Sequence, residues 1–136
     1  MTYDAAVRTP IILFGAFDRH NFGDLLFPHI AAALMPGRPL VFAGLAERDI
    51  RRWGGHQVVA LPRLALHIGD RPSKLVHVGG EILTCDAWRA AVMLLPPQQA
   101  QQTIAYLETR PRERIDWVHR MLGTSALAPY TVSRQA

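Results

Sequence analysis

Two short polar segments carry the residue types best suited to chemistry in this chain. The first, Asn21-Phe22-Gly23-Asp24, follows an apolar run over residues 11–17, and the second, Gly79-Gly80-Glu81, follows the run 75–78. A carboxylate in such a turn can accept hydrogen bonds from hydroxyl groups, or act as a general base where desolvation raises its pKa. Glycines let a ligand approach backbone amides that a Cβ would obstruct. These segments therefore predict a ligand site with two carboxylates.

We predict that Asp24 and Glu81 are the catalytic residues of this site, as hydrogen-bond acceptors or as general acid and base. Arg19 and His20 suit an anionic group, because arginine is a permanent cation and histidine can donate hydrogen bonds and carry a positive charge. The predicted binding residues are Arg19, His20, Asn21, Gly23, Gly79 and Gly80.

Each of these residues also has a structural interpretation. The Asp24 carboxylate can cap a helix, because it would accept amide hydrogens of the first turn near the positive end of the helix dipole. Asn21 can brace the turn, and Arg19 and His20 can simply face water. Glu81 can cap the following helix or pair with an arginine. The residue types alone leave both interpretations open.

A parallel α/β sheet would bring the two segments to one edge, since ligands of such sheets are held at the carboxyl ends of the strands. The predicted strands are nearly continuous apolar runs, which is typical of parallel strands covered on both faces. They span residues 11–17, 40–43, 57–61 and 74–78, with a short helix or turn at 47–53 and a short helix at 62–68.

The first predicted helix spans residues 24–35 and is stopped by Pro36-Gly37. Its apolar residues Leu26, Ile30, Ala33 and Leu34 recur at helical spacing. This periodicity predicts that they form the face that packs on the sheet.

The last third of the chain is predicted to be helical, with segments at 86–95, 97–109 and 111–122. We expect the last two helices to pack as a pair through apolar stripes formed by Ile104, Leu107, Ile115, Val118 and Leu122. The chain of 136 residues is thus predicted to be one Rossmann-like, three-layer domain with about four strands. Its α/β core would span 11–95, its helical pair 96–123, and a tail or truncated linker 124–136.

Composition narrows the classes of protein. Apolar residues make up 49% of the chain and charged residues 19%, and every long apolar stretch is interrupted before it could span a bilayer. The start of the chain lacks a secretion-signal pattern. The single Cys85 excludes an internal disulfide and agrees with a reducing compartment, so we expect a cytoplasmic protein.

The charges and histidines point away from nucleic acid and metal. The formal net charge is +4 and fourteen of the fifteen basic residues are arginine, which favours anionic partners. No aromatic residues alternate with a basic stripe, so nucleic-acid binding is not expected. His29, His56, His67 and His119 show no ligand spacing, and His77 is predicted to be a hydrogen-bonded core residue. No metal or other cofactor is predicted.

Residues 21–28 (NFGDLLFP) and 76–83 (VHVGGEIL) together resemble the polysaccharide pyruvyl transferase family. The resemblance implies a glycosyltransferase-like architecture of two Rossmann-like halves, of which this chain would be the N-terminal half. It also implies transfer of a pyruvyl group from phosphoenolpyruvate to sugar hydroxyls as a ketal, in polysaccharide biosynthesis. The chain departs from the family pattern at Glu81, where many relatives have Gly or Ser.

Three functional interpretations follow. The first is a cytoplasmic pyruvyl transferase, or a half that depends on a second half-domain or on self-association. The second is a non-catalytic binding or interaction module that has lost its other domain. The third is a flavodoxin-like domain with a phosphate ligand, although the chain lacks the glycine spacing of dinucleotide and phosphate-binding loops.

Overall fold

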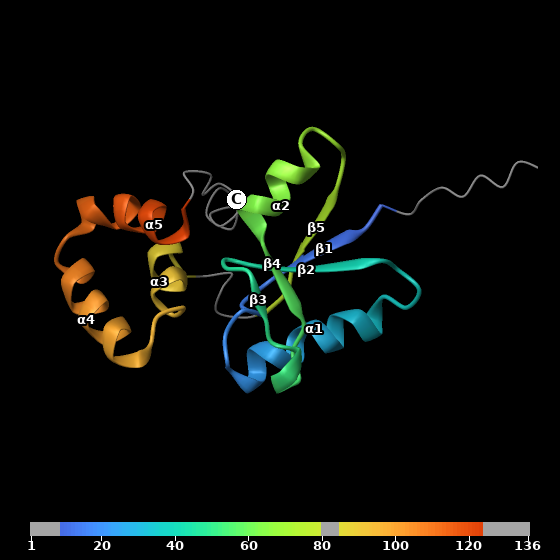
Figure 1. Cartoon of the computed structure of the whole chain (residues 1–136), viewed down its shortest axis with the longest axis horizontal. Helices are drawn as coiled ribbons and strands as arrows, with labels where there is room; N and C mark the ends of the chain where they lie inside the picture. The colour runs from blue at the N-terminus through green and yellow to red at the C-terminus, as the bar shows by residue number, and fades with distance from the viewer. Residues whose placement is uncertain (1–8, 80–84, 124–136) are drawn as a thin grey trace, which may run out of the picture.

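The structure is a computed structural model that describes residues 9–79 and 85–123 (Figure 1). Its strands are β1 (Ile11–Phe14), β2 (Leu40–Gly44), β3 (Arg48–Asp49), β4 (Gln57–Ala60) and β5 (Lys74–His77). Its helices are α1 (Phe22–Leu34), α2 (Leu61–Ile68), α3 (Ala87–Val92), α4 (Pro97–Glu108) and α5 (Arg114–Leu122). Two 3-10 turns, η1 (Arg51–Trp53) and η3 (Pro111–Glu113), complete these elements.

The strands form one sheet in the order β3-β4-β2-β1-β5. β1 pairs in parallel with β2 and β5, and β2 pairs in parallel with β4, whereas β3 is antiparallel to β4. The predicted α/β fold with a mainly parallel sheet is confirmed, and the arrangement is compatible with a Rossmann-like sandwich. The prediction of about four strands missed β3, because its two residues show no apolar run and depend on pairing with β4.

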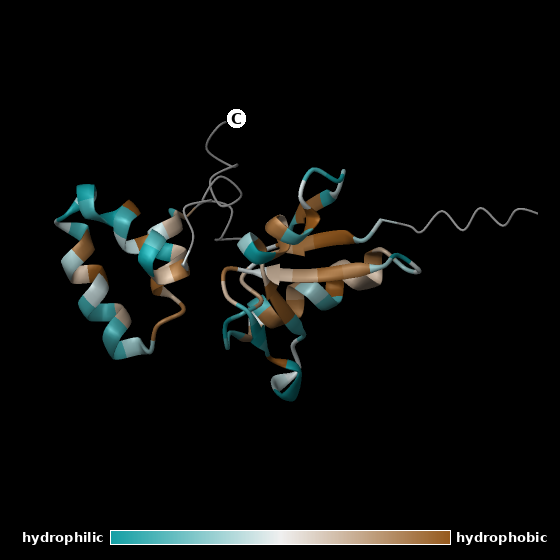
Figure 2. Cartoon of the chain, turned by 45° about the horizontal axis from the view of Figure 1, so that its top comes forward, coloured by the Kyte–Doolittle hydropathy of each residue, from teal (hydrophilic) through white to brown (hydrophobic). Residues whose placement is uncertain are grey.

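Helices cover both faces of the sheet. Successive strand residues point to opposite sides, and apolar residues on each side pack against a helix. Leu13 packs with Ala31 of α1 on one face, and Ile12 packs with Leu64 and Ile68 of α2 on the other. In Figure 2 the central strands are brown, as expected for strands between two apolar layers.

Helix α1 uses a different face from the one predicted. Pro28 and Ala31 are buried, whereas Leu26, Ile30 and Leu34 are exposed. The prediction was wrong because α1 carries apolar residues on both its inner and its outer side, so that spacing alone could not show which face meets the sheet.

The edge strand β5 is more open than predicted. Leu75 and Val76 are both partly exposed, although all strands were expected to be covered on both faces. β1 also ends at Phe14, three residues earlier than predicted, and the chain then turns through Gly15 toward α1. Phe17 is buried in this turn. The apolar run therefore continues past the end of β1, and its length alone could not show where the strand ends.

The three C-terminal helices gather beside the sheet in Figure 1 and share a small core. Trp88 and Val92 of α3 pack against Leu107 of α4 and Val118 of α5. The expected pairing of the last two helices is therefore incomplete, because α3 packs against both α4 and α5 and all three form one cluster. Ile115 is exposed, contrary to its predicted place in the stripe.

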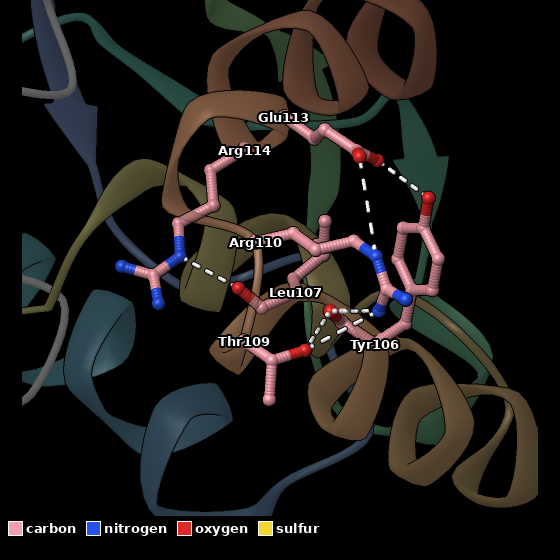
Figure 3. A network of polar contacts seen from close by, with 6 residues as sticks. All are labelled: Tyr106, Leu107, Thr109, Arg110, Glu113 and Arg114. Carbon is pink, nitrogen blue, oxygen red and sulfur yellow. Dashed lines mark hydrogen bonds and ion pairs between the residues drawn. The ribbon is translucent and has the colours of Figure 1, made fainter.

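Arg114 joins these helices, as Figure 3 shows. Its Nε donates to the carbonyl oxygen of Leu107 at 2.9 Å, and its Nη2 donates to that of Glu108 at 2.9 Å. The guanidinium also lies 4.8 Å from the centre of a Trp88 ring. Arg114 therefore satisfies carbonyl groups at the end of α4 while it covers the core.

Candidate functional site

The loops that lead from β1 and β5 to the two predicted segments leave the sheet side by side at its carboxyl edge. β1 and β5 are parallel neighbours, and the Val78 amide donates to the Phe14 carbonyl oxygen at 2.8 Å. A Cβ on Gly15 would lie 2.4 Å from the Val78 carbonyl oxygen, so the backbones approach as closely as a glycine allows. Gly79 follows with a φ of 127°, a conformation that favours glycine.

Gly80 and Glu81 lie outside the described residues. The expectation that the Glu81 carboxylate faces Asp24 across a cleft therefore stays a prediction. The adjacency of β1 and β5 fixes only that the segments following them leave the sheet at the same edge.

Asn21, rather than Asp24, caps α1. The Asn21 Oδ1 accepts hydrogen bonds from the backbone amides of Gly23 at 3.0 Å and Asp24 at 3.3 Å. Its extended backbone conformation and its amide side chain are typical of an N-cap. The structural interpretation of Asp24 as the cap was wrong because the helix begins two residues earlier than its apolar pattern indicated. The cap also occupies the amides of Gly23 and Asp24, so they are not open to a ligand.

Asp24 lies in the first turn of α1 and pairs with Arg19. The Arg19 Nη2 is 3.3 Å from Oδ2 of Asp24, and both side chains are only partly exposed. The His20 ring meets Trp53 of η1 edge-on at 4.7 Å between centroids. The structure therefore brings Arg19, Asn21, Gly23 and Asp24 together at the start of α1 and directs His20 toward η1.

Asp18 is the buried acid that sequence reasoning did not select. Its side chain is 1% exposed, and its Oδ2 accepts a hydrogen bond from the Ala46 amide at 2.8 Å. Burial raises the pKa of the Asp18 carboxyl, and the Ala46 hydrogen bond opposes that rise. A Cβ on Gly44 would lie 2.7 Å from this oxygen. One feature of the sequence could have indicated this residue: Asp18 is an acid that directly follows the apolar run 11–17, where the chain leaves a central strand.

Arg48 completes the connection between the loops at this edge. Its Nη1 donates to the backbone oxygen of Asp18 at 3.1 Å, and its Nη2 donates to that of Leu94 at 3.2 Å. Asp18 and Arg48 therefore hold together the loops after β1 and β2 and the end of the α3 region. Their enclosed position suits support of the site more than contact with a substrate.

His29 of α1, His56 and Phe42 form a stack of rings between α1 and the sheet. His29 Nε2 lies 2.6 Å from the Gly54 carbonyl oxygen, and the His29 and His56 rings are 4.3 Å apart. His56 stacks on Phe42 at 3.8 Å. Burial, and to a smaller extent His29, lowers the pKa of His56.

His77 differs from its prediction as a hydrogen-bonded core residue. It is only partly buried, its Nε2 has no hydrogen-bond partner, and its ring meets Phe14 edge-on at 5.4 Å. Burial lowers the pKa of His77. Within residues 9–79 and 85–123, no three His, Cys, Asp or Glu residues are grouped so that they could hold a metal ion.

A separate pocket of about 560 Å³ lies near the amino ends of β1, β2 and β5, at the opposite edge from the predicted site. Its walls are mainly apolar, and Arg71 and His67 lie among its lining residues. Arg71 is engaged there, because its Nε and Nη2 donate to the carbonyl oxygens of Ile68 and His67. None of the predicted site residues that the structure describes lines this pocket.

Comparison with known proteins identified no similar protein. No protein-family profile, curated protein or solved structure matches the chain. Among the described residues, no helix combines the length and the apolar character needed to cross a membrane.

Proposed function

We propose that this chain acts as the N-terminal half of a polysaccharide pyruvyl transferase-like enzyme in the cytoplasm. It would bind a sugar acceptor and phosphoenolpyruvate at the carboxyl edge of its sheet. The observation that carries the proposal is the adjacency of β1 and β5, because it brings the starts of both motif-bearing segments to one edge. Parallel sheets hold their ligands at this edge.

The Arg19–Asp24 pair supplies the two kinds of group that this reaction requires. A carboxylate can accept the proton of an attacking sugar hydroxyl, and a guanidinium can neutralise the charge of an enol phosphate. Because the Asn21 side chain already holds the amides of Gly23 and Asp24, the anionic donor would be met by Arg19 rather than by the start of α1. Donor binding would then release the Asp24 carboxylate toward the acceptor.

Transfer from phosphoenolpyruvate to a nucleotide- or lipid-linked sugar tests the proposal. The purified chain would be measured alone and mixed with a separately produced second half of a family member, with release of inorganic phosphate and formation of the ketal as readouts. We expect Asp24→Asn to lower turnover by at least about 100-fold, as the loss of a general base does. Asp116→Asn is the matched control, because Asp116 also lies in the first turn of a helix, α5.

Absence of turnover both alone and in the mixture would reject the enzymatic proposal. Full activity of Asp24→Asn would reject the role given to that carboxylate. The second candidate, a non-catalytic interaction module, is favoured by the exposed apolar side of α1. Light scattering over a range of concentrations tests self-association, since a strict monomer would count against that version of the module.

A further inference from the structure

The outward side of α1 is apolar where a surface helix is normally polar. It carries a row of exposed side chains, here called the α1 stripe: Phe22, Leu26, Phe27, Ile30 and Leu34. Phe22 and Leu34 at its ends are 84% and 76% exposed. No charged residue occurs from Leu25 to Gly37. Single exposed apolar residues are ordinary, but a continuous row along one helix marks an interaction surface.

Cations and an exposed tryptophan flank the α1 stripe. Arg38 lies in the turn after α1, where its amide donates to the Met35 carbonyl oxygen. η1 lies alongside α1, because the Gly54 carbonyl oxygen that follows η1 is 2.6 Å from Nε2 of His29. Trp53 of η1 contacts His20 just before α1 and is 56% exposed. The guanidinium of Arg52 lies 5.9 Å from the centre of the Trp53 ring.

The nearby acids are already paired, so the surroundings of the α1 stripe keep a positive charge. Asp24 lies within ion-pair distance of Arg19, and Asp49 binds Arg51. Among the ion pairs of the described part of the chain, none involves Arg38 or Arg52. The surface therefore combines an apolar row with two available cations and an interfacial aromatic residue.

We propose that the α1 stripe binds the surface of an anionic lipid bilayer. Its side chains would enter the boundary between headgroups and acyl chains, while Arg38 and Arg52 contact lipid phosphates and Trp53 lies at the level of the headgroups. A second copy of the chain fits the charges less well, since pairing two such surfaces would bring like charges together around an apolar centre. The proposal is independent of pyruvyl transfer.

Vesicle flotation of the full 136-residue chain tests this proposal. One probe is vesicles of phosphatidylcholine with about 30 mol% phosphatidylglycerol, and the other is vesicles of phosphatidylcholine alone. The two differ in surface charge, so their comparison tests the electrostatic part of binding. We expect binding to the anionic vesicles, weakened by added salt. The double variant Phe22→Ser and Leu34→Gln should lose at least about tenfold in vesicle affinity, because both removed side chains supply apolar contact.

Leu66→Gln is the matched control, since Leu66 is 86% exposed on α2 and is not part of the α1 stripe. It should bind vesicles as the unchanged chain does. All variants should keep the far-ultraviolet circular dichroism and melting temperature of the unchanged chain, because the replaced side chains face outward. Arg38→Gln with Arg52→Gln should lower affinity for anionic vesicles, with Arg112→Gln as the control.

Three results would overturn the proposal. The first is equal binding to both kinds of vesicle or to neither. The second is unchanged binding by the folded Phe22 and Leu34 double variant. The third is a concentration-dependent dimer that this double variant abolishes while vesicles are not bound, which would assign the α1 stripe to contact between copies.

Discussion

Replacement of Gly15 by alanine tests the close approach of β1 and β5 on which the site depends. The added Cβ would lie 2.4 Å from the Val78 carbonyl oxygen and 2.5 Å from Cε1 of Phe17. Cβ contacts under 3.0 Å essentially never occur, so the neighbouring backbone must retreat by at least about 0.6 Å. The Phe17 ring is fully buried and can move little.

The cost of this change follows from two effects. Overpacking of a buried position destabilises by about 1–3 kcal/mol, and a weakened hydrogen bond between Val78 and Phe14 adds about 0.5–1.5 kcal/mol. We therefore expect Gly15→Ala to lower the free energy of unfolding by about 1.5–4.5 kcal/mol. Urea denaturation followed by circular dichroism would measure the difference.

Gly23→Ala is the matched control for Gly15→Ala. A Cβ on Gly23 would meet only Oδ1 of Asn21, at 3.4 Å, and alanine favours the helix by up to about 1 kcal/mol. Its stability should therefore equal or exceed that of the unchanged chain. If Gly15→Ala were equally stable, β5 could not lie against the turn after β1, and the shared edge would be wrong.

Two further predictions concern Asp18 and Arg114. Burial raises the pKa of the Asp18 carboxyl above its unfolded value of 3.8, so the folded chain keeps this proton to a higher pH than the unfolded chain does. The contribution of Asp18 to stability therefore falls as the pH rises from the unfolded pKa toward the folded pKa. Asp18→Asn keeps an acceptor for the Ala46 amide and does not titrate. Its stability relative to the unchanged chain should therefore increase as the pH rises from about 3.5 to neutrality. Urea titrations that show the opposite trend would contradict burial as the cause. Arg114→Ala should lower the free energy of unfolding by about 1–3 kcal/mol, because it removes charged hydrogen bonds to α4, whereas Arg112→Ala in η3 should change it little.

The sequence predicted the parts of the fold that local composition determines. The apolar runs that became β1, β2, β4 and β5 indicated a parallel sheet, and Pro62–Ile68 indicated the short helix α2. β3 could not be predicted in this way, because it exists only through pairing of Arg48 and Asp49 with β4. The inward face of α1 was equally hidden, since both of its sides are apolar.

The candidate site was predicted only at the level of its segments. Asn21 and Asp24 were selected, but their capping roles depend on the residue at which α1 begins, and the apolar pattern does not fix that residue. The burial of Asp18 depends on how the loop after β2 folds over it, which no local pattern encodes.

The position of Arg48 has a consequence for how the C-terminal helices are held against the sheet. One guanidinium holds the loop after β1 through Asp18 and the segment after α3 through Leu94. Hydrogen bonds from a charged donor contribute about 1.5–3 kcal/mol each, so Arg48 adds to the apolar packing of Leu94 and Leu122 that holds the C-terminal helices against the sheet. Lysine lacks the planar fork and could not span both carbonyl groups. Arg48→Lys would therefore weaken this connection while it preserves the charge.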